Sequence, residues 1–274
     1  MKRLVSVLLV LLLWVCWSRA HDLFLKRDSF FLKPNRAVSI SLLNGTFEKS
    51  ENVITRDRMV DVSLVFPDGR RVHPDTSQWR DAGTVTVLDF ETGAPGTYVV
   101  GVSTAPRTIA LSARDFNNYL EHDGVLDVLE ARKRHNELDK DARERYAKHV
   151  KAILQVGEKR TETYATVLGY PVEFVPLSNP YALHEGDTLK VRMLRAGRPV
   201  ANHLVYASHA GFHGHGDEGG HREAVQTRTD ADGLVRIPLR AVGLWYVRAI
   251  YMERVSQPNA DYESNWATLT FEVR

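Results

Sequence analysis

The sequence predicts a mainly β protein: two immunoglobulin-like antiparallel β-sandwiches joined by a helical segment. Two observations support this prediction. Short runs that alternate apolar with polar residues, separated by Pro and Gly turns, fill both ends of the chain, as half-buried strands do. Between them, from Ser112 to about Val156, Gly and Pro are almost absent and helix-forming residues dominate. The predicted domains are therefore 21–110, 111–160 and 161–274, behind an N-terminal segment 1–20.

Residues 1–20 have the three parts of a cleavable signal peptide. Lys2 and Arg3 form a basic start, an apolar run follows, and Ser18-Arg19-Ala20 offers small residues at the cleavage site. The apolar run is shorter than the roughly 20 residues that a membrane-spanning helix needs. We therefore expect a periplasmic or secreted protein whose mature chain begins at His21 and has no transmembrane segment.

Cleavage would also change the chemistry of the chain. It removes the one cysteine, Cys16, so the mature chain has no disulfide and no thiolate ligand. A lipoprotein signal also places a cysteine after an apolar run, but it needs a small residue directly before it, and Val15 is not small. Loss of Lys2, Arg3 and Arg19 leaves 33 of the 36 basic residues against 34 acidic ones, a formal charge of −1 instead of +2. Without a strong basic excess, we expect no nucleic-acid partner.

The first predicted sandwich, 21–110, consists of short strand-type runs with turns between them. The turn Pro67-Asp68-Gly69 has a physical basis, because Pro presets φ and Gly accepts a positive φ. The predicted strands are 38–42, 60–66, 84–88 and 97–102.

The helical segment, 111–160, is predicted from apolar stripes at helical spacing. Phe116, Tyr119 and Leu120 recur at i, i+3 and i+4, and the later stripe predicts helix as far as about Val156. We expect two or three helices, broken at Gly124 and Gly157. The dense charge between Ala131 and Lys148 is interpreted as a solvated helix face. The acids interpreted as ordinary helix residues are Glu121, Asp123, Glu130 and Glu137.

Strand signals return after Thr161 and predict a second antiparallel sandwich of roughly a hundred residues, close to the immunoglobulin-like size. Turns with Gly, such as Glu185-Gly186-Asp187 and Asp232-Gly233, separate its strands. The predicted strands are 172–175, 188–194, 203–207, 234–238, 245–250 and 266–273.

Several motifs resemble those of a known group of proteins. They are the Ala20/His21 junction, Phe116-Asn-Asn-Tyr-Leu120, Tyr146-Ala-Lys148 leading to Gln155-Val-Gly157, the run 168–180, and Glu263-Ser-Asn-Trp-Ala-Thr-Leu-Thr-Phe271. Together they resemble the DUF4198 family, exported proteins that are connected with nickel or cobalt uptake. Segments 229–235 and 243–249 also look like transthyretin-like and carboxypeptidase-regulatory β-sandwiches. The resemblance implies a periplasmic metal-handling accessory, a substrate-binding or delivery partner of a membrane transporter.

His21 is the first candidate metal ligand. An N-terminal histidine brings its free α-amine and its own imidazole together as a compact nitrogen chelate, which suits copper, nickel and cobalt. The α-amine titrates near pH 7.7–8, so a metal must displace its proton. Asp22 could add a carboxylate. Alternatively, His21 merely follows a cleavage site that would accept other residues.

The second candidate is a Gly-rich loop between strands, residues 209–221, in which histidines and carboxylates are concentrated. Imidazole and carboxylate ligands of this kind suit nickel, cobalt, zinc or copper, and histidine-rich tracts are a compositional sign of metal binding. The alternative is a solvated loop that binds metal incidentally. The predicted metal ligands, with His21, are His209, His213, His215, Asp217 and His221.

The remaining histidines are scattered along the chain, and each is expected at the surface or in a satisfied structural role. They are His73, His122, His135, His149, His184 and His203. No nucleophile elbow, zinc-protease motif or phosphate-binding glycine loop is present, so we expect no enzyme activity.

The leading functional prediction is a protein that captures Ni²⁺ or Co²⁺, or a similar divalent ion such as Cu²⁺ or Zn²⁺, and passes it to a transporter. Two alternatives stay open: a copper-binding N-terminal-histidine protein or oxidase, and a non-catalytic β-sandwich binding module.

Overall fold

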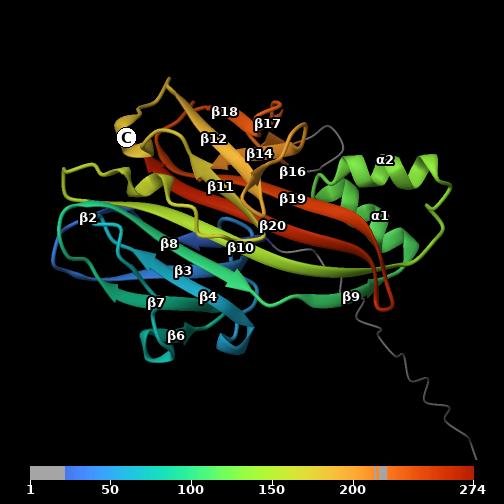
Figure 1. Cartoon of the computed structure of the whole chain (residues 1–274), viewed down its shortest axis with the longest axis horizontal. Helices are drawn as coiled ribbons and strands as arrows, with labels where there is room; N and C mark the ends of the chain where they lie inside the picture. The colour runs from blue at the N-terminus through green and yellow to red at the C-terminus, as the bar shows by residue number, and fades with distance from the viewer. Residues whose placement is uncertain (1–21, 213, 216–220) are drawn as a thin grey trace, which may run out of the picture.

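The computed structural model describes residues 22–212, 214–215 and 221–274, and it shows a mainly β chain with two helices (Figure 1). The predicted signal peptide and the candidate ligands His21, His213 and Asp217 lie outside the described residues. For His215 and His221 the structure gives only the backbone. None of the described helices is long and apolar enough to cross a membrane.

The described strands form three main sheets and one short hairpin. The first sheet has the order β1 (Asp22–Lys26), β3 (Ala37–Gly45), β7 (Val85–Glu91) and β6 (Trp79–Ala82). The third sheet has the order β11 (Val172–Pro176), β12 (Thr188–Arg195) and β13 (Arg198–Pro199), and β18 (Leu234–Pro238) also pairs with β12. The hairpin joins β15 (Gly214–His215) to β16 (His221–Arg222).

The middle sheet is the largest and runs through the centre of the molecule (Figure 1). Its order is β17 (Val225–Arg228), β14 (Leu204–His209), β19 (Gly243–Gln257), β20 (Ala260–Val273), β10 (Ala142–Val156), β8 (Gly96–Thr104), β4 (Met59–Val65) and β5 (Arg71–Val72). Two further strands, β2 (Phe31–Leu32) and β9 (Arg107–Leu111), pair with β10. Strands from both predicted sandwiches therefore share one sheet, and the layout of two separate immunoglobulin-like sandwiches is not confirmed.

The prediction of helix beyond residue 141 is wrong. Helices α1 (Ala113–His122) and α2 (Leu126–Arg134) form on either side of Gly124 as expected, but Ala142–Val156 is the strand β10. β10 lies between β20, to which it is parallel, and β8, to which it is antiparallel. Because both of its faces are covered, its residues are buried almost without interruption. A continuous buried run of this kind does not alternate, so its periodicity cannot distinguish a strand from a buried helix.

The two faces of the middle sheet carry different partners. Strand β1 packs on one face of β10 and β20, where Thr268 and Thr270 donate hydrogen bonds to backbone carbonyls of β1. Strand β11 packs on the other face, where Lys151 bonds Glu173. Because successive side chains alternate across a strand, neighbouring residues of β10 reach opposite sides. We call these the β1 face and the β11 face.

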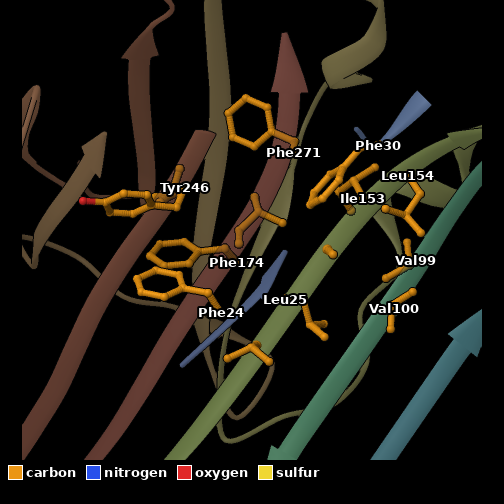
Figure 2. Packing of buried hydrophobic residues seen from close by; sticks show 14 of the residues in the cluster. Phe24, Leu25, Phe30, Val99, Val100, Ile153, Leu154, Phe174, Tyr246 and Phe271 are labelled. Atoms are coloured by element: carbon orange, nitrogen blue, oxygen red, sulfur yellow. The ribbon is translucent and has the colours of Figure 1, made fainter. Parts of the chain in front are cut away.

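The main hydrophobic core fills the space between the three sheets. Phe24 of β1 and Tyr246 of β19 pack with ring centroids 5.1 Å apart, and Phe174 and Phe271 are buried in the same core (Figure 2). A second, smaller core lies where α1 and α2 cover the part of the β1 face formed by the far ends of β19 and β20, around Phe116. Burial of such aromatic and aliphatic side chains, at about 25 cal/mol per Å², holds the sheets and helices together.

Short 3₁₀ turns complete the described structure: Arg56–Arg58, Thr76–Gln78, Glu162–Ala165 and Pro180–Ala182.

Candidate functional site

A cluster of buried charged side chains lies on the β1 face at the start of β1, one residue after the predicted mature N-terminus. We call it the N-terminal cluster; its members are Asp22, Asp123, Glu144, Lys148, Glu223 and Arg248. Four of them are acids and two are bases. Charged residues are almost never buried unless they are paired, so their concentration here marks the candidate site.

Asp22 is the first residue of β1 and lies opposite Gly45 of β3. Its side chain is only 15 % exposed, and its carboxylate lies 3.6 Å from Nε of Arg248. Burial raises the pKa of Asp22 to about 6, against the opposing attraction of Arg248. The carboxylate of Asp22 therefore loses its proton only near neutral pH.

Arg248 of β19 connects three segments of the chain. Its Nε lies 2.7 Å from Glu223, just after β16, and 3.6 Å from Asp22, and its Nη1 donates to the backbone carbonyl of Asp123 at 3.1 Å. Its guanidinium stacks 4.9 Å from the ring centroid of Tyr206. Burial alone would lower the pKa of Arg248, but the neighbouring carboxylates outweigh it and raise the pKa. Arg248 therefore stays a fixed cation.

Lys148 is the second base, on the β1 face of β10. Its Nζ donates to Oδ1 of Asn44 at 3.0 Å and lies 5.2 Å from the ring centroid of Trp266. Burial lowers the pKa of Lys148 to about 8, although Asp22 works in the opposite direction. A lysine with such a pKa is partly neutral at mildly alkaline pH, so the charge of this cluster changes with pH at two of its members.

Glu144 lies at the end of the cluster that α1 covers. Its carboxylate accepts hydrogen bonds from Tyr119, at 3.0 Å, and from Ser264. Burial raises the pKa of Glu144, while the hydrogen bonds from Ser264 and Tyr119 oppose that shift. The ring of Tyr119 stacks on Trp266 with centroids 5.9 Å apart, which closes this end of the cluster with aromatic side chains.

The turn between α1 and α2 brings Asp123 to Arg248. Gly124, directly after it, has φ +77°, and a Cβ there would lie 2.3 Å from Oη of Tyr206. The Tyr206 hydroxyl donates to the Gly124 carbonyl at 2.9 Å. A glycine is therefore required at position 124, and through it the helices are fixed against β14.

The predicted histidine loop is divided by the fold. His209 ends β14 opposite Trp245, and its ring packs 4.9 Å from the Trp245 ring. Arg248 pairs with Tyr206, so alternation places His209 and Arg248 on opposite faces of the sheet. Nδ1 of His209 lies 3.0 Å from the carbonyl of Ala210. As the donor of that bond, Nδ1 carries the proton and leaves Nε2 with the lone pair that a metal needs.

Two other histidines of the loop lie opposite each other in the backbone. The register of the β15–β16 hairpin pairs His215 with His221. Glu223, which holds Arg248, follows this hairpin after one residue. The hairpin therefore leads directly into the N-terminal cluster. Within the described residues, no group of three or more His, Cys, Asp or Glu side chains is placed to hold a metal ion.

Sequence reasoning missed most of this cluster. The charge between Ala131 and Lys148 is not simply a solvated face, because Arg132, Glu137, Glu144 and Lys148 are buried. Asp123, interpreted as an ordinary helix acid, is the residue that ends α1 and is likewise buried. A usable signal was present at Arg248, which interrupts the apolar strand run 244–250 and so required a buried partner.

Among the scattered histidines, the expectation of a satisfied structural role is confirmed for His149 and His203. His149 bonds Ser103 and Asn265, and Nε2 of His203 lies 3.2 Å from the carbonyl of Ile250. Both are largely buried, and burial lowers the pKa of each, so each stays neutral near pH 7.

Solved structures give only distant similarities. A Salmonella alpha-2-macroglobulin reacted with methylamine has 12 % identity and a TM-score of 0.24, over 93 % of this chain and 15 % of that one. Trypsin-activated alpha-2-macroglobulin from Escherichia coli has 10 % identity and a TM-score of 0.24, over 93 % of this chain and 16 % of that one. The D0-D1 domain of intimin has 14 % identity and a TM-score of 0.20, over 92 % of this chain and 98 % of that one. This chain spans less than a fifth of the macroglobulin chains, and TM-scores this low carry no argument about fold or function.

No curated protein matches the sequence. The profile of one family, described as "Domain of unknown function (DUF4198)", matches residues 18–253, most of the chain. The chain therefore belongs to the DUF4198 family, as its motifs predicted.

Proposed function

We propose that this protein is an exported metal-binding accessory that captures Ni²⁺ or Co²⁺ at its mature N-terminus and delivers it to a membrane transporter. The ligands are the α-amine and imidazole of His21 together with histidines of the segment 213–221. One observation carries the proposal: Asp22, next to His21, and Glu223, two residues after His221, hold the same guanidinium of Arg248. Asp22 and Glu223, which adjoin the two segments that hold the proposed ligands, therefore lie close to each other at Arg248.

The charge of the N-terminal cluster favours a cation. Its four acids exceed its two bases, and charges in a largely buried environment interact more strongly than in water. Asp22 adds its negative charge above pH 6, the range in which the α-amine and imidazole also become available as neutral ligands. Capture should therefore strengthen from pH 5 to pH 8, as protons leave all three groups.

His209 is not a ligand of the proposed site, because it lies on the other face of the middle sheet from Arg248. His215 and His221, paired in the hairpin, are the ligands that the backbone brings closest together. His213 and Asp217 complete the set proposed from the sequence.

The test is metal titration of the mature protein, beginning at His21, with Ni²⁺, Co²⁺, Cu²⁺ and Zn²⁺ followed by calorimetry. A matched form with one glycine before His21 moves the α-amine away while keeping every side chain. We expect at least a tenfold loss of affinity in the extended form, equal to about 1.4 kcal/mol. His221→Ala should weaken binding similarly, and His184→Ala, an exposed histidine elsewhere, should not. Equal affinity of the native and extended forms contradicts the proposal.

Delivery is tested in the source cells. Deleting the gene should lower the accumulation of nickel or cobalt when the external metal is scarce. A complementing copy that starts at His21 after export should restore it, and a copy with the extra glycine should not. Full restoration by both copies would show that capture at the N-terminus is not what supports uptake.

A further inference from the structure

Arg58 is a buried cation for which the described residues provide no counter-charge. It ends the 3₁₀ turn Arg56–Arg58, directly before β4, and is only 8 % exposed. None of the ion pairs among the described residues includes Arg58, and its Nε is buried without a hydrogen-bond partner. Charged side chains are almost never buried unpaired, because the hydration that they lose is then not replaced. Arg58 is therefore a candidate for binding an anion from outside the chain.

Three basic side chains surround the ring of Tyr146, on β10. Cζ of Arg58 and Nζ of Lys148 each lie 5.8 Å from the centroid of this ring. Arg107, the first residue of β9, is the register partner of Tyr146, so their side chains lie next to each other on the same face of the sheet. Tyr146 precedes Lys148 by two residues and shares the β1 face with it. The basic side chains therefore gather on the β1 face, opposite the face that carries a cavity of about 480 Å³.

The positive charge at this place is not balanced by neighbouring acids. Burial lowers the pKa of Arg58, and the charge of Arg107 lowers it further. Burial also lowers the pKa of Lys148, and the charge of Arg58 adds to this effect, although Asp22 opposes it. Asp57, the acid next to Arg58 in the sequence, is exposed to solvent. Guanidinium groups keep their charge in proteins, so Arg58 and Arg107 together face one solvated carboxylate.

Hydrogen-bond donors remain available beside Tyr146. Arg107 is exposed, and no other described residue holds its guanidinium by a hydrogen bond or an ion pair. Nη2 of Arg58 donates to the carbonyl of Ala105 at 3.3 Å, a long hydrogen bond. Tyr146 is half-buried and adds a hydroxyl. The planar fork of a guanidinium matches the paired oxygens of a carboxylate or a phosphate, so these donors suit an oxyanion.

We propose that Arg58 and Arg107, with the hydroxyl of Tyr146, bind an oxyanion: the carboxylate or phosphate group of a small molecule. The anion supplies the counter-charge that the chain does not give to Arg58. Lys148 adds electrostatic attraction without direct contact, because charges in a largely buried environment act over longer distances than in water. The site uses none of the proposed metal ligands, so it does not depend on the proposed function.

The experiment uses a chain that begins at His21, in Tris buffer at pH 7. Metal is removed with EDTA, and the EDTA is then dialysed away because it is itself a polycarboxylate. Sodium phosphate and sodium acetate are titrated separately, at a constant ionic strength set with sodium chloride, while the midpoint of thermal unfolding is followed. A ligand that binds only the folded state stabilises it. We expect the midpoint to rise with at least one of these anions at millimolar concentration, and the more effective anion identifies the group that the site prefers.

Arg107→Gln should weaken the binding of the anion at least fivefold, and the variant should fold because Arg107 is exposed. Arg240→Gln is the matched control: it removes the same charge from an exposed arginine outside the site and should leave the response to the anion unchanged. Arg58→Met removes the buried charge but keeps an apolar chain, and it should abolish the response.

The proposal is overturned if neither anion raises the midpoint above that in sodium chloride of equal ionic strength. It is also overturned if Arg107→Gln and Arg240→Gln respond alike, or if folded Arg58→Met keeps the full response. Circular dichroism checks the fold of each variant.

Discussion

At the scale of single residues, the most consequential feature is the pairing of buried charges. Lys151 and Glu173 are each 2 % exposed and form an ion pair 2.7 Å long. Lys151 also donates to the carbonyls of Thr166 and Phe174. Removing one partner of such a pair leaves the other charge buried and uncompensated.

Glu173→Gln should therefore destabilise the protein by about 3–5 kcal/mol, the usual cost of breaking a buried pair. Urea unfolding followed by tryptophan fluorescence measures this loss. Glu130→Gln, which breaks the exposed pair with Lys133 at 2.7 Å, is the control and should leave the midpoint unchanged. A small effect of Glu173→Gln would mean that water reaches the pair.

Asp22 gives a pH dependence with a definite sign. Its pKa rises from 3.8 to about 6 on folding, so the folded state binds the proton more strongly. Ionising Asp22 therefore costs stability, a cost that is absent below pH 3.8 and complete above about pH 6. Relative to Asp22→Asn, the wild type should lose about 2–3 kcal/mol between pH 4 and pH 7. The prediction is tested by measuring the free energy of urea unfolding for both proteins across this pH range. If the free energies of the two proteins change with pH in parallel, the burial of the carboxylate is contradicted.

At the scale of elements, Gly124 couples the helical pair to the middle sheet. Its φ of +77° and its contact with Tyr206 leave no room for a Cβ. The guanidinium of Arg248 also stacks on the ring of Tyr206. The position of Tyr206 therefore affects both the turn at Gly124 and the N-terminal cluster.

Gly124→Ala should cost about 2–4 kcal/mol, since it adds a clash to the conformational strain. Gly186 is the matched control, because it has φ +96° but open space where a Cβ would be. Gly186→Ala should cost only about 1–2 kcal/mol, the strain alone. Chemical denaturation compares the two. Equal losses would show that Tyr206 moves aside without cost.

Strand β10 explains why the helical prediction failed where it did. Two residues of one dipeptide, Lys148 and His149, serve different sites on opposite faces of the sheet. In a linear reading, such buried polar residues resemble the solvated face of a helix. Pairing with β8 and β20 overrides the local preference of the segment, because tertiary packing outweighs differences in propensity of a few tenths of a kcal/mol per residue.

At the scale of the whole molecule, the middle sheet unites the two halves of the chain. β8 and β4 come from the first half and β14, β19 and β20 from the second, with β10 between them. The main core likewise extends from Leu23 to Val273. Neither half can be removed without exposing an edge and the core beneath it.

Scanning calorimetry should therefore show one cooperative transition for a chain that begins at His21, with calorimetric and van't Hoff enthalpies in agreement. Residues 21–110 expressed alone should not fold, because β8 loses β10 as its neighbour. Two resolved transitions, or a folded 21–110 fragment, would contradict this single unit and support independent sandwiches.

Outside residues 142–156, the sequence by itself determined the main elements of local structure. Every predicted strand run overlaps an observed strand, and α1 and α2 form on either side of Gly124, because alternation and turn residues act over a few neighbours. It also identified the family. Only the tertiary structure decided that 142–156 is a strand, that Arg248 joins Asp22 to Glu223, and that His149 and Asn265 line a cavity. These arrangements depend on sheet register between residues such as Glu144 and Tyr262, 118 positions apart, and on contacts such as that of Asp22 with Arg248, 226 positions apart, which no local pattern records.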